Sequence, residues 1–307
     1  MKKNIRIGTR ESQLAVWQAM QVKNLLFLHG FSAELVYIKS EGDIDLKTPL
    51  YEMGVQGIFT RSLDAALLTN KIDIAVHSMK DVPTQLPQGI IQSAVLPRGP
   101  VNDLLVFKNG KDFLNDEFYA ANIATSSLRR KAQWLNKHPT HHIHNLRGNV
   151  NTRLRKLTEE NWDAAIFAQA GLERIDLRPE NSQVIDWMLP APAQGAIMVV
   201  CRKEDSYTLE ACSNFNDEPT ALCTKIERDF LRTLLGGCST PISALAIMSD
   251  SNIHFKGNIL SLDGSKKTAI EKIMAVPVAA DLGKTAAEEL LTNGGKEIAE
   301  EIHHAVK

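Results

Sequence analysis

The chain has 307 residues, a formal net charge of -1, 44% hydrophobic residues and 23% charged residues. This length is enough for about two or three domains, and the near-neutral charge gives no reason to expect non-specific binding to nucleic acid. No apolar run is long enough to cross a bilayer, and no apolar segment typical of a secretory signal follows Met1. We therefore expect a cytoplasmic protein that binds neither nucleic acid nor membranes.

The first part of the chain alternates strands and helices. Apolar runs and helical spacing predict a strand at 4–8, a helix at 11–29 that ends at Gly30, a strand at 34–38, a helix at 58–68 and a strand at 73–77. The pattern then restarts, with strands at 103–107, 122–124, 142–146 and 164–168 and helices at 127–136 and 151–160. Such alternation is typical of α/β sheets with helices on both faces, whose ligands bind at the carboxyl ends of the strands.

The C-terminal part has a different pattern. A helix at 218–235 is followed by strands at 242–248, 253–260 and 269–275, and then by helices at 282–291 and 297–305. Strands followed by helices predict a small α+β domain. Segments rich in Pro and Gly at 97–100 and 190–195 are the predicted hinges, and the apolar strand at 196–201 could return to the sheet of the first block.

Two basic segments follow predicted strands and begin helices. Residues 125–130 read Thr-Ser-Ser-Leu-Arg-Arg, and residues 146–153 read Leu-Arg-Gly-Asn-Val-Asn-Thr-Arg. Hydroxyls, free backbone N–H groups and guanidinium groups together can hold several carboxylates or phosphates. The alternative is a solvated helix face with surface ion pairs. That alternative suits Arg155 but not Arg129 and Arg130, because basic residues in a first helical turn oppose the helix dipole. An anion bound there would remove the conflict.

Asp81 directly follows a predicted buried strand, within the segment His77-Ser78-Met79-Lys80-Asp81-Val82-Pro83. A carboxylate beside Lys80 at a strand end is expected to stay ionised. It could then stabilise a developing cation or accept an N–H hydrogen bond. The alternative is an Asx turn or a helix cap before Pro83, and the sequence leaves both open.

The chain has four cysteines, which are Cys201, Cys212, Cys223 and Cys238. They form no C-x-x-C pair, so neither a disulfide framework nor a structural zinc site is expected. Cys238 differs from the others because Gly236-Gly237 precede it, which predicts a tight loop after a helix. A cysteine on a loop can be a nucleophile or a covalent attachment point, and the alternative is a small buried filler.

No metal site or nucleotide site is predicted. His138, His141, His142 and His144 have no carboxylate or cysteine at ligand spacing. Neither a G-x-G-x-x-G fingerprint nor a Walker A pattern occurs in the sequence.

Four segments together resemble one family. They are residues 77–83, 125–130, 146–153 and 236–242, which in order and spacing resemble the motifs of porphobilinogen deaminases, also called hydroxymethylbilane synthases. The resemblance implies an α/β fold of two lobes similar to the halves of type II periplasmic binding proteins, plus a small α+β C-terminal domain that carries a cofactor cysteine. The implied domains are 1–98 with 194–214, then 99–193, and then 215–307.

The resemblance also implies a transferase of tetrapyrrole and haem biosynthesis. In this family, four porphobilinogen molecules condense head to tail, with release of ammonia, to give hydroxymethylbilane. A dipyrromethane cofactor, joined to Cys238 by a thioether, would prime the chain and stay behind when the product is hydrolysed off. The substrate would be the small molecule porphobilinogen, and the protein would be a monomer.

The resemblance assigns roles to particular residues. Asp81 would be catalytic, facing the pyrrole nitrogens and stabilising the cation formed on deamination. Each pyrrole carries an acetate and a propionate, so guanidinium partners are expected at Arg10, Arg129, Arg130, Arg147, Arg153 and Arg174. Hydroxyl donors are expected at Ser12, Thr125, Ser126 and Ser127. Further contacts are expected at Asp43, Ser78, Lys80, Gly148, Asn149, Gln194, Gly195 and Ala196, with Phe59 as a ring contact.

Some positions depart from the usual family pattern. Val55-Gln56-Gly57 stands where Gly-Lys-Gly is common, and Glu52 occupies another commonly basic position. The loop at 40–57 could therefore contribute backbone N–H groups in place of side-chain cations. Pro192 in the second hinge could stiffen it.

Two other functions compete with this one. A non-catalytic anion-binding protein on the same two lobes would explain the arginines but gives Asp81 and Cys238 no task. Nucleic-acid binding through residues 129–155 would require interleaved aromatic residues and a basic overall charge, which the chain lacks.

Overall fold

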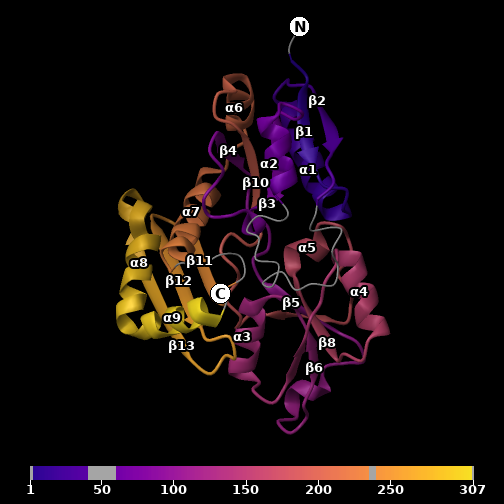
Figure 1. Ribbon diagram of the computed structural model, residues 1–307, viewed down its shortest axis with the longest axis vertical. Coiled ribbons are helices and arrows are strands. Elements are labelled where there is room, and N and C mark those ends of the chain that lie inside the picture. Colours follow the sequence, from indigo (N-terminus) through magenta and orange to yellow (C-terminus); the bar gives the residue numbers. More distant parts are fainter. Residues whose placement is uncertain (1–2, 41–59, 235–239, 306–307) are drawn as a thin grey trace. The chain divides into compact units, whose positions relative to one another are not determined.

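The computed structural model describes residues 3–40, 60–234 and 240–305 (Figure 1). These residues form two compact units. The first unit holds residues 3–40, 60–99 and 195–222, and the second holds residues 100–194, 223–234 and 240–305. Among the described residues, the first unit contains one five-stranded sheet, and the second contains a five-stranded and a three-stranded sheet.

The sheet of the first unit has the strand order β2-β1-β3-β10-β4. Its strands are β1 (Ile5–Thr9), β2 (Ala33–Tyr37), β3 (Ile74–Ser78), β4 (Ile90–Val95) and β10 (Ile197–Arg202). Strand β1 is parallel to β2 and β3, whereas β10 is antiparallel to β3 and β4. The predicted return of the apolar strand after the second hinge to this sheet is therefore confirmed.

Helices cover both faces of this sheet. They are α1 (Gln13–Leu28), α2 (Arg61–Leu68) and α6 (Ser206–Ser213). On one face, Val22 and Leu26 of α1 pack with Ile5 and Val199 of the sheet, and α6 joins the same cluster. On the other face, a Cβ on Gly8 would lie only 2.2 Å from Ile72 Cδ1, so this glycine allows the segment after α2 to approach β1.

The five-stranded sheet of the second unit has the order β7-β6-β8-β5-β9. Its strands are β5 (Asp103–Phe107), β6 (Asn122–Ala124), β7 (His142–His144), β8 (Ala164–Ala168) and β9 (Ser182–Ile185). Helix α3 (Leu128–Lys137) packs its Trp134 on one face, and helices α4 (Val150–Glu159) and α5 (Gln169–Glu173) pack Leu157 and Leu172 on the other. A short helical turn, η3 (Asp112–Asn115), follows β5.

The two five-stranded sheets have the same arrangement. In each, three parallel strands are followed by one antiparallel strand, which is β10 in the first unit and β5 in the second. Each of these strands begins just after the chain has passed from one unit to the other. The start of the antiparallel strand therefore lies at the same sheet edge as the carboxyl ends of the parallel strands. This is the edge at which α/β sheets bind ligands.

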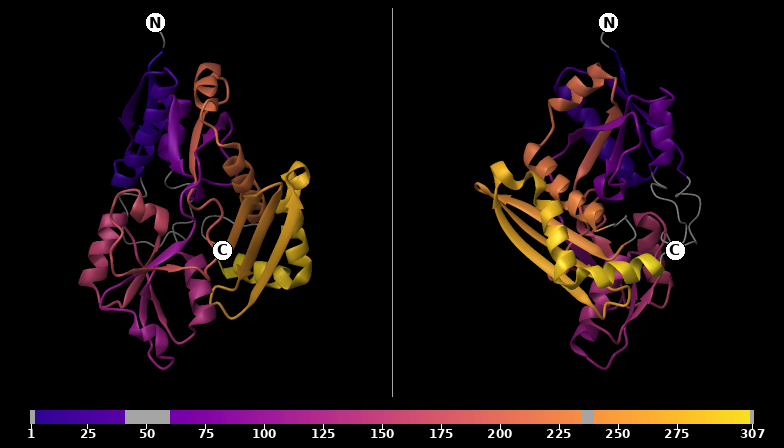
Figure 2. Two further views of the ribbon diagram at one scale, coloured as in Figure 1. Left: turned by 180° about the vertical axis from the view of Figure 1, so that it is seen from behind. Right: turned by 60° about the vertical axis from the view of Figure 1, so that its left-hand side comes forward.

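The C-terminal sheet is antiparallel, with the order β11-β12-β13 (Figure 2). Its strands are β11 (Ile242–Ser249), β12 (Asn252–Leu260) and β13 (Lys267–Ala275), and the helices α7 (Glu218–Thr233), α8 (Leu282–Leu290) and α9 (Lys296–Ala305) accompany them. Two further turns, η4 (Val276–Asp281) and η5 (Leu291–Gly295), flank α8. On one face of β12, Ile253, Phe255 and Ile259 are buried, whereas on the other face His254 and Lys256 are exposed but Asn258 and Leu260 are buried.

The predicted fold class, two α/β lobes plus a small α+β C-terminal region, is confirmed by this topology. The exact division into three domains stays a prediction, because the C-terminal sheet belongs to the same compact unit as the second lobe. Within that unit, Gln133 Nε2 donates to Ser243 Oγ at 3.0 Å and Asn136 Nδ2 donates to the Gly264 carbonyl at 2.8 Å. No helix in the described ranges combines the length and the apolar character that crossing a bilayer requires.

Candidate functional site

One edge of the first unit's sheet gathers the site residues that were predicted there. Arg10 and Ser12 follow β1, Lys80 and Asp81 follow β3, and Ala196 precedes β10. Ser78 and Ile197 are in register on β3 and β10. The Met79 N–H donates to the Ala196 carbonyl at 3.0 Å, and the Gly99 N–H donates to the Gly195 carbonyl at 3.0 Å. The structure thus brings these residues to one sheet edge, and their contact with a ligand stays a prediction.

Asp81 ends a short 3₁₀ helix, η2 (Met79–Asp81), which begins directly after β3. Met79 is buried and anchors this turn, whereas Asp81 is only half-buried. Among the described residues, the Asp81 carboxylate makes neither a hydrogen bond nor an ion pair. An Asx turn or cap, the alternative left open by the sequence, is therefore not observed, and both carboxylate oxygens can accept from a ligand.

His77 and Ser78 support this turn from the two faces of β3. Ser78 Oγ accepts a hydrogen bond from Gln18 Nε2 of α1 at 2.8 Å. His77 is buried, and in the part of the chain that the structure describes its Nε2 has no hydrogen-bond partner. Burial, helped by the positive charge of Arg10, lowers the pKa of His77 to about 4. The imidazole is therefore neutral at physiological pH. His77 stood in the motif but was not predicted as a site residue.

The hydroxyl residues after β6 mainly hold their own loop in the second unit. Ser126 Oγ donates to the Leu146 carbonyl at 2.6 Å and accepts from the Leu146 N–H at 2.9 Å, so it ties the loop after β6 to the loop after β7. Thr125 Oγ1 accepts from the Ser127 N–H at 3.2 Å, and Ser127 caps α3 by accepting from the Arg130 N–H at 3.4 Å. Their contact with a ligand stays a prediction.

The loop after β7 is built around Gly148. Gly148 has φ +113°, and a Cβ there would lie 2.6 Å from the Thr152 side chain. Asn149 caps α4 by accepting from the Thr152 N–H at 2.9 Å, and Arg153 Nε donates to the Gly148 carbonyl at 2.7 Å. Arg147 in the same loop is buried. The motif 146–153 therefore encodes a specific loop as well as two guanidinium groups.

Arg129 and Arg130 are not free cations at a helix start. Both are buried, and both contact Asp103, the first residue of β5. Arg129 Nη2 lies 2.7 Å from Asp103 Oδ2, and Arg130 Nη2 lies 2.8 Å from Asp103 Oδ1. Gln194 Nε2 also donates to Asp103 Oδ1, at 2.9 Å. Asp103, a carboxylate of the fold, therefore already removes part of the conflict with the helix dipole, and the binding of a further anion there stays a prediction.

This cluster still carries a net positive charge, because two guanidinium groups share one carboxylate. Burial lowers the pKa of Arg129, partly offset by Asp103, and burial also lowers the pKa of Arg174 after α5 to about 10. Both side chains remain cationic at neutral pH. A carboxylate that binds near them would regain part of the lost solvation energy.

Three predicted site residues, Asp43, Phe59 and Cys238, lie outside the described residues, as do Glu52 and Gln56. The other cysteines, Cys201, Cys212 and Cys223, are buried and form no disulfide with one another. Burial raises the pKa of Cys201 to about 11 and that of Cys212 to about 12, so neither is a thiolate at neutral pH.

The histidines of the segment 138–144 have contacts within the fold. His141 Nδ1 accepts from Trp134 Nε1 at 3.1 Å, and the rings of His138 and His141 are stacked with centroids 4.9 Å apart. In the described ranges, no group of three or more His, Cys, Asp or Glu side chains is placed to hold a metal ion.

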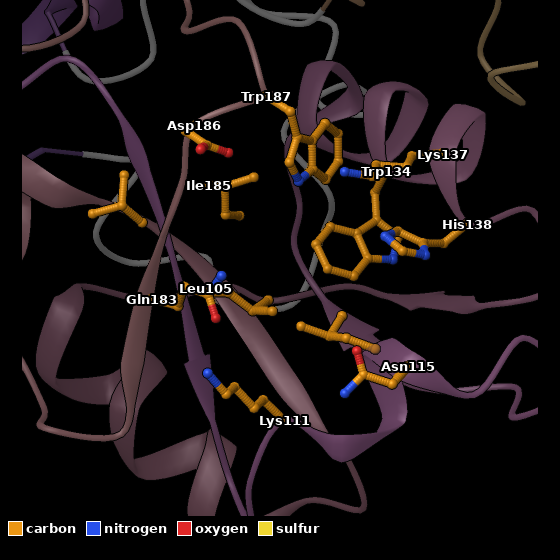
Figure 3. Close-up of a pocket in the computed structure, with 12 residues that line it drawn as sticks. Leu105, Lys111, Asn115, Trp134, Lys137, His138, Gln183, Ile185, Asp186 and Trp187 are labelled. Atoms are coloured by element: carbon orange, nitrogen blue, oxygen red, sulfur yellow. The ribbon is translucent and has the colours of Figure 1, made fainter.

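A pocket of about 420 Å³ lies elsewhere in the second unit (Figure 3). One side of it is formed by Trp134 and Lys137 of α3, by His138 directly after this helix and by Trp187 after β9. Lys137 Nζ lies 4.4 Å from the centre of the Trp187 ring. None of the predicted site residues lines this pocket. Its walls come from separate segments, so no local sequence pattern predicts it.

Comparisons with known proteins match most of the length of the chain. Residues 5–210 match the family model "Porphobilinogen deaminase, dipyromethane cofactor binding domain", and residues 221–292 match "Porphobilinogen deaminase, C-terminal domain". The porphobilinogen deaminase of Chlorobium phaeobacteroides is 40% identical over 311 residues, covering 98% of this chain and 99% of the relative. That of Syntrophotalea carbinolica is 42% identical over 300 residues, covering 96% and 94%.

Solved structures give more distant matches. An ancestral cationic amino acid solute binding protein is 15% identical with a TM-score of 0.43, covering 69% of this chain and 87% of that one. YhfZ from Shigella flexneri is 14% identical with a TM-score of 0.37, covering 72% and 92%. The family models and the two relatives span nearly the whole chain. The chain therefore belongs to the porphobilinogen deaminase family.

Proposed function

We propose that this protein is a porphobilinogen deaminase, or hydroxymethylbilane synthase. It condenses four porphobilinogen molecules head to tail, releases ammonia and hydrolyses off hydroxymethylbilane, a step of tetrapyrrole and haem biosynthesis. The observation that carries the proposal is the Asp81 carboxylate, which stands at a ligand-binding sheet edge without a partner among the described residues. A substrate that becomes cationic on losing ammonia needs such a group.

The dipyrromethane cofactor of the family fits the residues of the second unit. Its pyrroles carry carboxylates, and the edge of this sheet offers a cluster with net positive charge in which Arg129 Nε is buried and has no hydrogen-bond partner among the described residues. We propose that Arg129, Arg147, Arg153 and Arg174 hold the carboxylates of the cofactor and of the substrate rings joined to it, and that Cys238 is the thioether attachment point. When bound, the cofactor supplies the pyrrole end to which the first substrate is joined.

Asp81 would act on the substrate's pyrrole nitrogen. As the bond between the aminomethyl carbon and its nitrogen breaks and ammonia leaves, positive charge spreads over the ring. The carboxylate accepts a hydrogen bond from the ring N–H and stabilises that charge. After the new carbon–carbon bond forms, the ring carbon loses a proton, which the same carboxylate can accept. Lys80 and Arg10 at this edge would attract the substrate's acetate and propionate, and Ser12 and Ser78 would donate hydrogen bonds.

The finer features of the proposal follow from the family. We propose three domains, with boundaries near residues 98, 193 and 214, a monomeric state and a cytoplasmic location. Metal ions and nucleic acid have no role in it. The neutral overall charge and the local concentration of arginines support a small anionic ligand over a polyanion.

Intact mass and turnover together test the proposal. Purified protein should be heavier than its bare chain by the mass of a dipyrromethane, Cys238→Ala should show the bare mass, and the matched variant Cys223→Ala should keep the addition. Asp81→Ala should fold normally but lose porphobilinogen consumption by at least about a hundredfold. A bare chain that binds porphobilinogen without consuming it, even with primer supplied, would favour the competing anion-binding protein.

A further inference from the structure

Asp103 is a buried carboxylate at the edge of the second unit's sheet to which several side chains donate hydrogen bonds. It is 0% exposed and accepts hydrogen bonds from Arg129, Arg130 and Gln194. We infer that Asp103 is a positioning residue which gives the two neighbouring arginines different tasks. Arg130 fixes the cluster, and Arg129 contacts a carboxylate of the pyrrole chain, an assignment that rests on the function proposed above.

Arg130 uses all three of its nitrogens within the fold. Nε and Nη2 donate to Asp103 Oδ1 at 3.2 and 2.8 Å, and Nη1 donates to the Ile166 carbonyl of β8 at 2.9 Å. The guanidinium group thus bridges β5 and β8 beneath the sheet edge. Removing a guanidinium with these contacts leaves a buried carboxylate and a buried carbonyl short of donors, so Arg130 stabilises the edge.

Arg129 makes fewer hydrogen bonds within the fold than Arg130 does. Nη2 donates to Asp103 Oδ2 at 2.7 Å and Nη1 donates to the Leu189 carbonyl at 2.9 Å, but its buried Nε has no hydrogen-bond partner among the described residues. A buried N–H without an acceptor is unfavourable, and native structures rarely leave one unless a ligand or an ion completes it. The same ligand carboxylate would balance the second positive charge of the cluster.

Asp103 also connects this cluster to the segments where the chain passes between units. Gln194 Nε2 donates to Asp103 at 2.9 Å and to the Val101 carbonyl at 2.7 Å. Val101 lies where the chain enters the second unit, and Gln194 lies where it leaves. The residues around Gln194 have left-handed backbone, with φ +62° at Ala193 and +86° at Gly195. One carboxylate therefore orients Arg129 and fixes both passing segments.

The comparison of Arg129→Lys with Arg130→Lys tests the division of tasks, using holoprotein checked by intact mass. Arg129→Lys should raise KM for porphobilinogen about tenfold and lower Tm less than Arg130→Lys does, because Arg129 makes fewer hydrogen bonds within the fold. Arg130→Lys should lower Tm by about 5–10 °C and change KM by less than about threefold. Arg155→Lys is the control, because Arg155 is an exposed arginine that pairs with Glu159 on α4.

A measurement of ligand binding tests the same division of tasks without turnover. In an Asp81→Ala background, adding porphobilinogen should raise Tm, and that rise should be lost with Arg129→Lys and kept with Arg130→Lys. If the two arginine variants change KM, Tm and the ligand-induced rise alike, or if Arg130→Lys carries the KM effect, the division of tasks is wrong.

Asp103→Asn tests the positioning role itself. KM should rise about as much as in Arg129→Lys, although Asp103 itself does not contact the ligand, and the double variant should raise KM no further than either single change. Additive effects would show that Asp103 does not act through Arg129. If Asp103→Asn fails to fold, the two arginine variants decide alone.

Measurements on the unmodified protein show whether the proposed function or only the roles of Asp103, Arg129 and Arg130 are wrong. If it carries no dipyrromethane mass and consumes no porphobilinogen, the proposed function fails. If it is active but its Arg129 and Arg130 variants behave alike, only the assignment of Asp103, Arg129 and Arg130 fails.

Discussion

Gln18 Nε2 donates a 2.8 Å hydrogen bond to Ser78 Oγ, which ties the middle of helix α1 to the last residue of β3. Gln18 is a buried polar residue on a helix face that otherwise packs apolar side chains. Ser78 directly precedes the turn that ends with Asp81. A helix far away in the sequence thus contacts the residue that directly precedes the turn of the proposed catalytic carboxylate.

We expect Gln18→Leu to weaken this support without abolishing the fold. The lost hydrogen bond should lower the free energy of unfolding by about 1–2 kcal/mol, and a less firmly held turn should lower kcat more than it raises KM. Urea denaturation and steady-state kinetics measure the two effects. Gln85→Leu, at an exposed position after the same turn, should change neither quantity. An unchanged kcat in Gln18→Leu would show that α1 does not position Asp81.

The buried His77 should make the protein less stable in mild acid. Its pKa is lowered from 6.5 to about 4, so between these values the unfolded chain binds a proton that the folded protein does not. The free energy of unfolding should therefore fall as the pH decreases from about 6.5 towards 4. The His77 contribution between pH 7 and pH 5 should be on the order of 2 kcal/mol.

His77→Leu should flatten this pH dependence, measured by urea denaturation at pH 7, 6 and 5. Part of the dependence should remain, because burial also lowers the pKa of His138 and that of His141. His254→Gln, at an exposed position on β12, should keep the slope of the unmodified protein. The same slope in His77→Leu would mean that His77 is protonated in the folded protein.

Local sequence patterns predict most of the secondary structure. The helix expected at 127–136 is α3, and the strand expected at 103–107 is β5 with the same bounds. The strands β4 and β9 and the helices α5 and α6 were not predicted. In β4, Gln92 and Ser93 interrupt the apolar run, and Ser93 Oγ donates to the Val199 carbonyl of β10. That partner is distant in sequence, so no local pattern shows the strand.

The sequence predicts which residues follow parallel strands, and the structure places those residues at the sheet edges. Parallel strands bring the residues after them to one edge, so the grouping of Thr125 with Arg147 needed only the order of the elements. The role of Asp103 could not be predicted in this way. It reaches Arg129 and Arg130 because β5 enters the sheet antiparallel to β8, and that topology depends on how the chain passes between units.

Asp73 should be a major source of stability in the first unit. It is fully buried, accepts from Arg6 Nε at 3.0 Å, and lies 2.8 Å from Lys3 Nζ and 3.1 Å from Arg202 Nη2. Asp73→Asn should lower the free energy of unfolding at pH 7 by about 3–5 kcal/mol, because it removes the carboxylate that pairs with Arg6 and leaves Lys3 and Arg202 to share Asp205. Asp250→Asn, at an exposed turn, is the matched control.

The same group should contribute to acid denaturation. Burial alone would raise the pKa of Asp73, but the hydrogen bonds from Arg6 and Lys3 outweigh it and hold the pKa far below its ordinary value of 3.8. The stabilisation is therefore complete above about pH 4 and is lost as the pH falls below it. The difference in unfolding free energy between Asp73→Asn and the unmodified protein should shrink below pH 4, and a constant difference would contradict the charge-based explanation.

Two glycines with left-handed backbone separate the effect of strain from the effect of a clash. Gly264, in the turn between β12 and β13, has φ +77°, and a Cβ there would lie 2.4 Å from the Ala132 carbonyl oxygen and 2.7 Å from the Asn136 nitrogen of α3. Gly110 has φ +124°, and an added Cβ would meet no described atom within 4 Å. Both substitutions to alanine strain the backbone, but only the one at Gly264 also pushes the turn away from α3.

We therefore expect Gly264→Ala to lower the free energy of unfolding by about 2–4 kcal/mol and Gly110→Ala by about 1 kcal/mol. Gly264→Ala should also break the hydrogen bond from Asn136 to the Gly264 carbonyl, so hydrogen exchange in α3 should accelerate in this variant only. Helix α3 carries Arg129 and Arg130, and the variant should raise KM for porphobilinogen if the C-terminal sheet helps to hold that helix. Equal effects of the two alanines on stability and exchange would mean that the turn and α3 are not in contact in solution.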